Sequence, residues 1–162
     1  MATSKSAAGA AKTRREELPD CAVERCLSIL SDRWSFLIVR DALMLGIERF
    51  ADFQKSLGIA PNVLTARLDH LVEAGLMTKR FYQEPGSRRR RSYHLTRAGQ
   101  DLALPFAALQ QWGDLHEPHP QGPSMERRSA TGASLRVALL DETDTPVPTA
   151  DLSFLPTERM IA

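Results

Sequence analysis

The stretch GIAPNVLTARLDHLVEAGL, residues 58–76, places the strongest constraint on the fold. Gly58 ends whatever helix precedes it, and Pro61 suits the first helical position, where a missing N–H costs no hydrogen bond. Gly75 is a natural residue to follow the helix end. Between Pro61 and Gly75, the apolar residues that recur at helical spacing are Leu64, Leu68, Leu71 and Val72. The stretch therefore predicts a short amphipathic helix set directly behind a tight turn.

Three more helices are predicted before this stretch. Residues 23–30 carry apolar side chains at Val23, Cys26, Leu27 and Leu30, an amphipathic spacing that predicts Cys26 to be buried as a small apolar residue. Asp32 can cap the apolar segment 34–45, which Gly46 ends. A shorter helix follows over residues 50–57, with Phe50, Phe53 and Leu57 on one face.

After residue 76 the sequence no longer shows the helical spacing of apolar residues. Residues 77–83 and 90–95 are rich in Phe, Tyr and Thr and flank the turn EPGSRR, a pattern that predicts a β-hairpin with a basic tip. Thr96 can then cap a long helix from about 97 to 115, which Pro105 should kink or interrupt. The resulting order is typical of a winged helix-turn-helix. The predicted fold class is α+β and mainly helical, a winged helix-turn-helix with a long C-terminal helix and a small C-terminal extension.

This order assigns roles to two groups of residues. Reading helices present their N-terminal half to the major groove, where Asn and Arg pair with base edges. The predicted DNA-contacting residues of the reading helix are Asn62, Val63, Thr65, Ala66, Arg67 and His70. Those of the wing are Ser87, Arg88, Arg89, Arg90 and Arg91, which can follow phosphates or enter a minor groove.

Charge is unevenly distributed along the chain. The net charge is only +1, yet residues 67–97 hold eight basic and three acidic side chains, and residues 113–162 hold four and eight. Local positive charge of this density favours a polyanionic partner such as double-stranded DNA. Each feature has a plainer interpretation: many helical domains contain a helix-turn-helix, and an arginine cluster can be a solvated surface. A winged-helix module that binds protein or RNA is therefore the alternative function.

Other function classes find little support. No phosphate-binding loop, paired acid motif or metal triad is present, so we expect no enzyme activity, cofactor or metal site. His116, Glu117 and His119 lie close in sequence, but the prolines around them favour a linker. No apolar run reaches the ~20 residues of a membrane helix, and the polar N-terminus lacks a signal sequence, so we expect a cytoplasmic protein.

Three segments then resemble a known family. CAVERCLSILSDRWSFLIVRDAL, RFADFQKSLGIAPNVLTARLDHLVEAGL and YHLTRAGQDL are similar to HxlR-type winged helix-turn-helix transcriptional regulators, over about residues 20–116. The resemblance implies a transcriptional regulator, more often a repressor, that binds a pseudo-palindromic operator as a homodimer. It also implies that the first helix and the last long helix carry the dimer interface, at Leu102, Phe106, Leu109 and Trp112.

The resemblance leaves the input signal open. In some relatives a cysteine at the place of Cys21 senses oxidants, and a position just before a helix favours the thiolate. The alternative is that Cys21 is an inert small residue or a neighbour of the helix N-terminal cap. A small apolar or aromatic effector between the central helix (Trp34, Phe36) and the dimer helix (Phe106, Trp112) is the other expectation, although these aromatic residues can be plain core.

Composition divides the chain into three parts. Residues 1–19 are predicted to be a disordered tail, and residues 20–116 the DNA-binding and dimerisation domain. Residues 117–162 begin with a Pro- and Gly-rich linker and continue into a small β-hairpin-like extension. In that extension 134–141 is predicted as one strand, TDTPVP as the turn and DLSFLP as the second strand.

Overall fold

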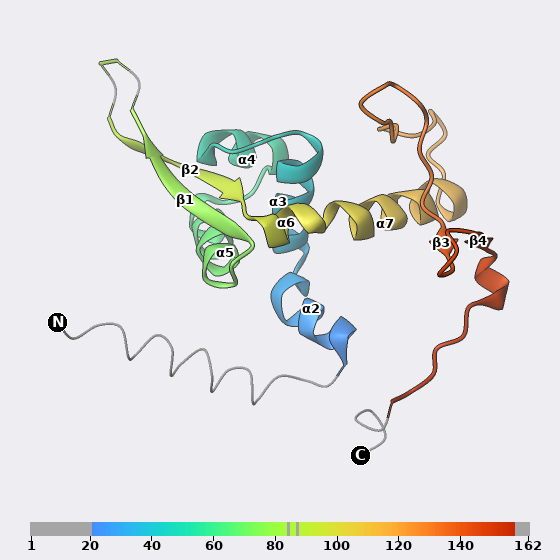
Figure 1. Cartoon of the computed structure of the whole chain (residues 1–162). Helices are drawn as coiled ribbons and strands as arrows, with labels where there is room; N and C mark the ends of the chain where they lie inside the picture. Colours follow the sequence, from blue (N-terminus) through green and yellow to red (C-terminus); the bar gives the residue numbers. More distant parts are fainter. Residues whose placement is uncertain (1–20, 84, 87, 158–162) are drawn as a thin grey trace.

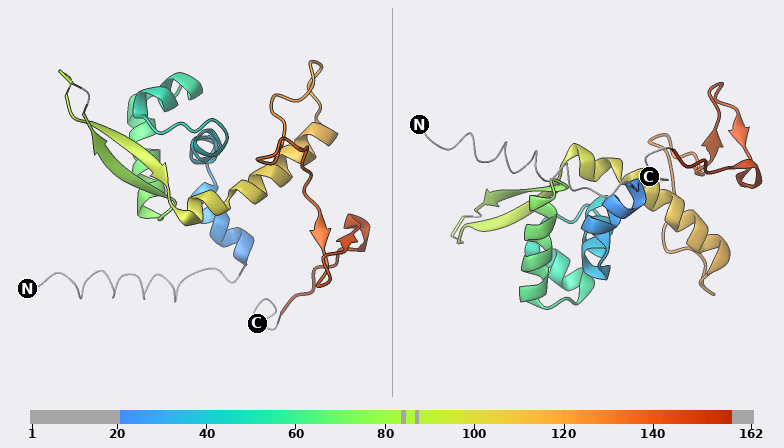
Figure 2. Two further views of the ribbon diagram at one scale, coloured as in Figure 1. Left: turned by 45° about the horizontal axis from the view of Figure 1, so that its top comes forward. Right: turned by 90° about the horizontal axis from the view of Figure 1, so that it is seen from below.

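The computed structural model describes residues 21–83, 85–86 and 88–157. Figure 1 shows a helical body with a β-hairpin on one side and a long helix with the C-terminal extension on the other. The two further views in Figure 2 show the same separation of hairpin and extension. The fold class is α+β and mainly helical, as predicted. The predicted tail lies outside the described residues.

The helical body consists of α2 (Ala22–Leu30), α3 (Arg33–Met44), α4 (Phe50–Leu57) and α5 (Pro61–Glu73). Asp32 caps α3 as predicted, because its carboxylate accepts hydrogen bonds from the N–H groups of Trp34 and Ser35, each at 3.0 Å. Gly46 follows the end of α3 with a φ of 64°. These local signals set the helix boundaries within a residue or two of the predicted positions.

The turn between α4 and α5 is built as the sequence indicated. Gly58 adopts the left-handed conformation (φ 61°) at the C-cap of α4, which a side chain would strain. Pro61 is the first residue of α5, and Gly75 (φ 77°) lies just past its end. The Leu76 N–H donates to the Leu71 carbonyl oxygen at 3.0 Å, so the chain folds back onto the helix end before the first strand begins.

The wing is a two-stranded antiparallel hairpin of β1 (Met77–Tyr82) and β2 (Arg90–Leu95). Its register runs from Met77 opposite Leu95 to Tyr82 opposite Arg90. The base of the hairpin is anchored to the helical body: the Tyr93 N–H donates to the Glu48 carbonyl at 2.7 Å, and Arg49 forms a bridge with Ser92. The hairpin prediction is confirmed.

The expected single helix after the wing is two helices, α6 (Arg97–Asp101) and α7 (Ala103–His116). Thr96 caps α6 by accepting a hydrogen bond from Gly99 N–H at 3.2 Å. The interruption at Leu102 precedes Pro105, which therefore sits in the first turn of α7 and need not donate to Asp101. Of the two predicted outcomes, a kink or a short break near Pro105, the structure shows the break, which falls at Leu102.

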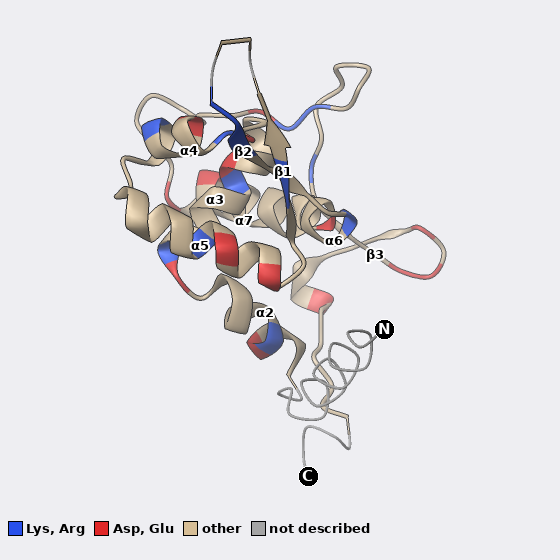
Figure 3. Cartoon of the chain, turned by 90° about the vertical axis from the view of Figure 1, so that its left-hand side faces the viewer, with Lys and Arg blue, Asp and Glu red and all other residues tan. Residues whose placement is uncertain are grey.

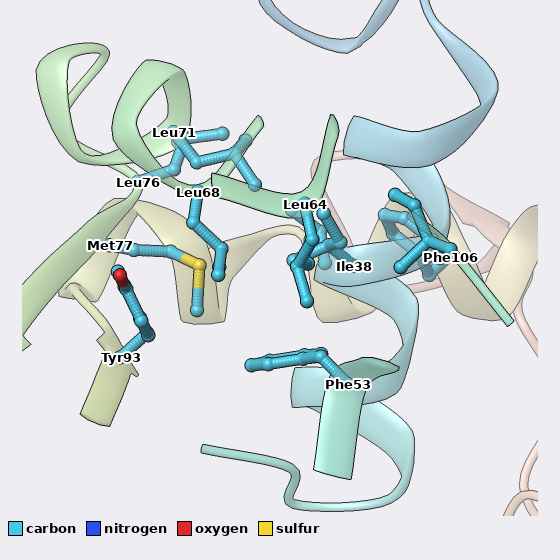
Figure 4. Packing of buried hydrophobic residues seen from close by; sticks show 11 residues of the cluster. Ile38, Phe53, Leu64, Leu68, Leu71, Leu76, Met77, Tyr93 and Phe106 are labelled. Atoms are coloured by element: carbon cyan, nitrogen blue, oxygen red, sulfur yellow. The ribbon is translucent and has the colours of Figure 1, made fainter. Parts of the chain in front are cut away.

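The hydrophobic core lies where α3, α4, α5 and the base of the wing meet (Figure 4). It comprises Ile38, Val39, Phe53, Ile59, Leu64, Leu68, Leu71, Leu76, Met77, Tyr93 and Phe106. One prediction is wrong here. Cys26 is exposed rather than buried, because no element of the described residues covers its side of α2. Val72 is partly buried and packs on the rim of the core.

The strands of the C-terminal extension lie at other residues than predicted. Its hairpin pairs β3 (Leu139–Leu140) with β4 (Pro146–Val147), followed by a single 3-10 turn, η1 (Thr149–Asp151). Only the end of the segment 134–141 is strand, and DLSFLP is not a strand. The segment expected to be the turn supplies the partner strand instead, because Asp141 closes a shorter turn by accepting hydrogen bonds from the Thr143 and Thr145 N–H groups.

Candidate nucleic-acid interface

The outer face of α5 is held in place by leucines on its inner face. Leu64, Leu68 and Leu71 are fully buried, which fixes the rotation of the helix. That rotation leaves Asn62 and Ala66 exposed and Val63 and Thr65 partly exposed. No side chain caps the start of α5 at Ala60. The first-turn N–H groups of α5 therefore lack a side-chain acceptor, an arrangement suited to a phosphate.

Two predicted reading residues lie further along α5 and turn toward α2 and α3. The Arg67 Nε lies 3.2 Å from the Asp32 Oδ1, with the Arg67 side chain 40% exposed. The His70 Nε2 lies 3.2 Å from the Ile29 carbonyl oxygen. Arg67 remains within reach of solvent, whereas His70 is engaged with the end of α2.

Asp32 connects helix capping to the reading helix. Partial burial raises the pKa of its carboxyl, but the hydrogen bonds from Ser35, the positive charge of Arg67 and the hydrogen bond from Trp34 outweigh burial and lower it below the ordinary 3.8. The ionised carboxylate thus caps α3 and pairs with α5 at once. The ion pair positions the Arg67 guanidinium beside the turn before α3.

The wing arginines are exposed and carried on an aromatic side chain. The Arg89 guanidinium lies 4.1 Å from the centroid of the Phe81 ring, and that of Arg91 lies 5.9 Å from it. Stacking of this kind orders a long side chain while leaving its N–H groups available. Arg88 and Arg90 are also exposed, and Ser87 lies outside the described residues.

The reading helix and the wing share one hollow on the surface. A depression of about 370 Å³ is lined by Phe50, Ala51, Thr65, Tyr82, Arg90, Arg91 and Tyr93. It therefore joins the N-terminal part of α4, the exposed face of α5 and the basic strand β2. Figure 3 shows basic residues along the wing and acidic residues on α5. Lys79 of β1 neutralises one of these, Asp69, at 2.5 Å.

Arg49 is a basic residue of this region that the sequence did not single out. It is the N-cap residue of α4, and its guanidinium lies 4.8 Å from the Tyr82 ring centroid. Its place beside the wing comes from the bridge between Arg49 and Ser92, residues more than 40 positions apart. In the sequence, the only indication of this role is that Arg49 directly precedes α4, the first helix of the helix-turn-helix pair.

The residues predicted for the dimer interface differ in how far they are exposed. Phe106 is 4% exposed and stacks on Phe36 with ring centroids 4.3 Å apart, so it belongs to the core of its own chain; its placement at an interface is corrected accordingly. Leu102 is partly buried against that core. Leu109 and Trp112 are 51% and 58% exposed on the outer face of α7.

Cys21 and the histidines near residue 116 have defined surroundings. Cys21 is the N-cap residue of α2 and is partly exposed, with a free thiol. His116 packs on Trp112, and the His119 Nδ1 accepts a hydrogen bond from Gln121 N–H at 3.2 Å.

Over the described residues, no three His, Cys, Asp or Glu side chains come together as a metal site, and no helix is long and apolar enough to cross a membrane.

A reading helix uncapped at its start, with a basic hairpin beside it, defines a winged helix-turn-helix DNA-binding protein. Residues 29–121 match the family described as HxlR-like helix-turn-helix. The chain belongs to this family, and it is a DNA-binding transcriptional regulator.

Individual relatives agree with this assignment. An uncharacterised HTH-type transcriptional regulator of Mycobacterium tuberculosis, Rv3095, is 39% identical over 109 residues, 67% of each chain. The crystal structure of the candidate transcription factor PA1607 is similar over 88% of this chain and 99% of its own, with 34% identity and a TM-score of 0.74. The reduced form of the transcriptional regulator YodB from B. subtilis matches 62% of this chain and 99% of its own, with 29% identity and a TM-score of 0.51.

Proposed function

We propose that this regulator binds a pseudo-palindromic operator as a homodimer, with the N-terminal half of α5 in the major groove and the wing on the adjacent backbone. The observation that carries the proposal is the shared hollow, in which Thr65 of α5 faces the same space as Arg90 and Arg91 of β2. A duplex lying over this hollow meets base-reading and phosphate-binding groups together. The proposed reading residues are Asn62, Val63, Thr65, Ala66 and Arg67, with His70 at the margin; the proposed wing contacts are Arg88, Arg89, Arg90 and Arg91.

The homodimer is supported by two uncovered apolar surfaces. Val23 and Leu27 on α2 are 66% and 53% exposed, and Leu109 and Trp112 are exposed on α7. Large apolar residues grouped on two helices are costly to leave in water. Residues 20–116 thus form the DNA-binding and dimerisation unit, with residues 117–162 as an addition to it. A dimer places its two reading helices on successive turns of DNA.

Cys21 is the proposed point of redox input. Its partly exposed thiol at the start of α2 lies on an element of the proposed dimer interface, where modification would change how two chains pack. Replacing Cys21 with Ser should abolish the loss of DNA binding after treatment with a thiol oxidant. Cys26→Ser is the matched control, because Cys26 is exposed on the same helix. An unchanged oxidant response in Cys21→Ser would leave thiol sensing at this residue without support.

Fluorescence anisotropy with labelled duplexes tests the DNA-binding surface. One duplex comes from upstream of the gene itself, and the other is its shuffled version, at one fixed salt concentration. Binding of the first at least ~1,000-fold tighter than the second is the expected result for a sequence-specific regulator. Weak and equal binding, persisting with duplexes selected from genome fragments, would favour the protein- or RNA-binding alternative.

The wing is tested by replacing Arg90 and Arg91 together with Ala. Affinity for all duplexes should fall, and the slope of log affinity against log salt should decrease by about one unit for each phosphate that the wing no longer neutralises. Arg97→Ala is the control, since Arg97 is also exposed but pairs with Asp101 on α6 and does not line the hollow. A double variant with an unchanged salt slope would show that Arg90 and Arg91 do not contact phosphates.

A further inference from the structure

An open cavity of about 740 Å³ lies between the end of α3, the first half of α7 and the C-terminal extension, and Leu104, Leu135 and Leu140 in its wall are each more than half exposed. Each of these elements contributes apolar side chains to its wall. The apolar lining includes Leu43 and Met44 of α3, Leu104 and Phe106 of α7, and Leu135 and Leu140 of the extension. A volume of this size falls within the range of ~300–1,000 Å³ that small-molecule sites occupy.

The outer wall of the cavity is held to α7 by specific polar contacts. The Gln111 side-chain amide donates to the Val137 carbonyl at 2.9 Å and accepts from the Val137 N–H at 2.8 Å. The Gln110 Nε2 donates to the Met125 carbonyl at 2.7 Å, and Arg127 pairs with Asp114 at 3.0 Å. The extension is therefore fixed along α7 by side chains of α7 itself, and the cavity between them is a feature of the fold.

The polar lining of the cavity is predominantly cationic. Arg127, Arg128 and Arg136 line it, with Glu126 as the one acidic residue. Arg128 is engaged by Glu126, and Arg127 by Asp114. Within the described part of the chain no hydrogen bond or ion pair occupies Arg136, and the Nε of Arg127 is buried without an acceptor. A free guanidinium beside an apolar cavity is suited to a carboxylate on an apolar body.

We infer that this cavity binds an apolar monocarboxylic acid, with its hydrocarbon part between α3, α7 and the extension and its carboxylate on Arg136. Phe106 links the site to the core, because it lines the cavity and stacks on Phe36 of α3. α3 in turn contacts α5. An occupant therefore touches a residue that packs the core beneath the reading helix. Its role as an effector rests on the function proposed above, whereas binding of the acid does not.

Isothermal titration calorimetry of the full chain with decanoate and decanol tests the site without DNA. Decanoate should bind saturably, one per chain, about tenfold tighter than the uncharged alcohol. Arg136→Gln should reduce decanoate affinity to that of decanol and leave decanol unchanged. Ala103→Trp, at an exposed lining position, should weaken both ligands at least about tenfold by filling the space. Ala107→Phe on the next turn is a second filling variant should the first fail to fold.

Three results would overturn the inference. They are an absence of saturable decanoate binding up to about 1 mM, decanoate affinity that Arg136→Gln does not change, and filling variants that alter only the oligomeric state in light scattering. The last would mean that a second copy covers this face. Operator affinity measured with and without decanoate then separates the two proposals. Binding of decanoate without an effect on operator affinity overturns the effector role alone, and absence of specific DNA binding in both states overturns the proposed function.

Discussion

Replacing Gly99 with Ala should destabilise the protein because this glycine allows α6 to lie directly on the end of the reading-helix turn. A Cβ at Gly99 would lie 2.2 Å from the Leu76 carbonyl oxygen and 2.9 Å from a Leu95 methyl carbon. Restoring an ordinary separation requires a shift of about 1 Å, an overpacking that costs ~1–3 kcal/mol. The shift also loosens the hydrogen bonds of Thr96 to the Gly75 and Leu76 carbonyls, at 2.7 and 3.0 Å.

Weakening these hydrogen bonds costs about 1 kcal/mol more, and the helix gains about 1 kcal/mol from Gly→Ala, so the net decrease in the free energy of unfolding is about 2 kcal/mol. Equilibrium urea unfolding followed by circular dichroism, at one fixed protein concentration, measures it. Gly113→Ala is the matched control: Gly113 is also helical, but a Cβ there meets nothing within 4 Å. It should stabilise the protein by up to about 1 kcal/mol. If Gly99→Ala were as stable as Gly113→Ala, the packing argument would be refuted.

Three further predictions concern the reading helix and the dimer. Arg67→Ala should weaken operator binding by ~1–3 kcal/mol if Arg67 reads a base; unchanged discrimination between operator and shuffled duplex would leave Arg67 only its ion pair with Asp32. Because the folded pKa of Asp32 is lowered, its stabilising effect is complete above 3.8 and is lost as pH falls through the lower folded value. The difference in unfolding free energy between wild type and Asp32→Asn should therefore shrink only in strong acid, and a difference that vanished near neutral pH would contradict this. Trp112→Asp should shift the mass measured by light scattering from dimer to monomer while circular dichroism stays unchanged; a dimer of undiminished stability would place the interface elsewhere.

The sequence by itself determined the elements from α2 to β2 and their order. The turn before α5, the cap at Asp32, the cap at Thr96 and the hairpin all depend on residues within a few positions of one another. Steric and hydrogen-bonding preferences of Gly, Pro, Asp and Thr act over that same short range. The winged-helix order and the basic hairpin beside the reading helix therefore follow from local signals.

The tertiary structure decided what each amphipathic face meets. The resemblance to the family placed Phe106 and Trp112 on one predicted interface, yet Phe106 stacks on Phe36 in the core and Trp112 stays exposed. Cys26 has apolar spacing, but no element of the described residues covers it. Gln111 fixes the extension through Val137, 26 residues away, and thereby creates a cavity that no local pattern indicates. Periodicity shows that a face avoids water, but which surface covers it depends on contacts between distant parts of the chain.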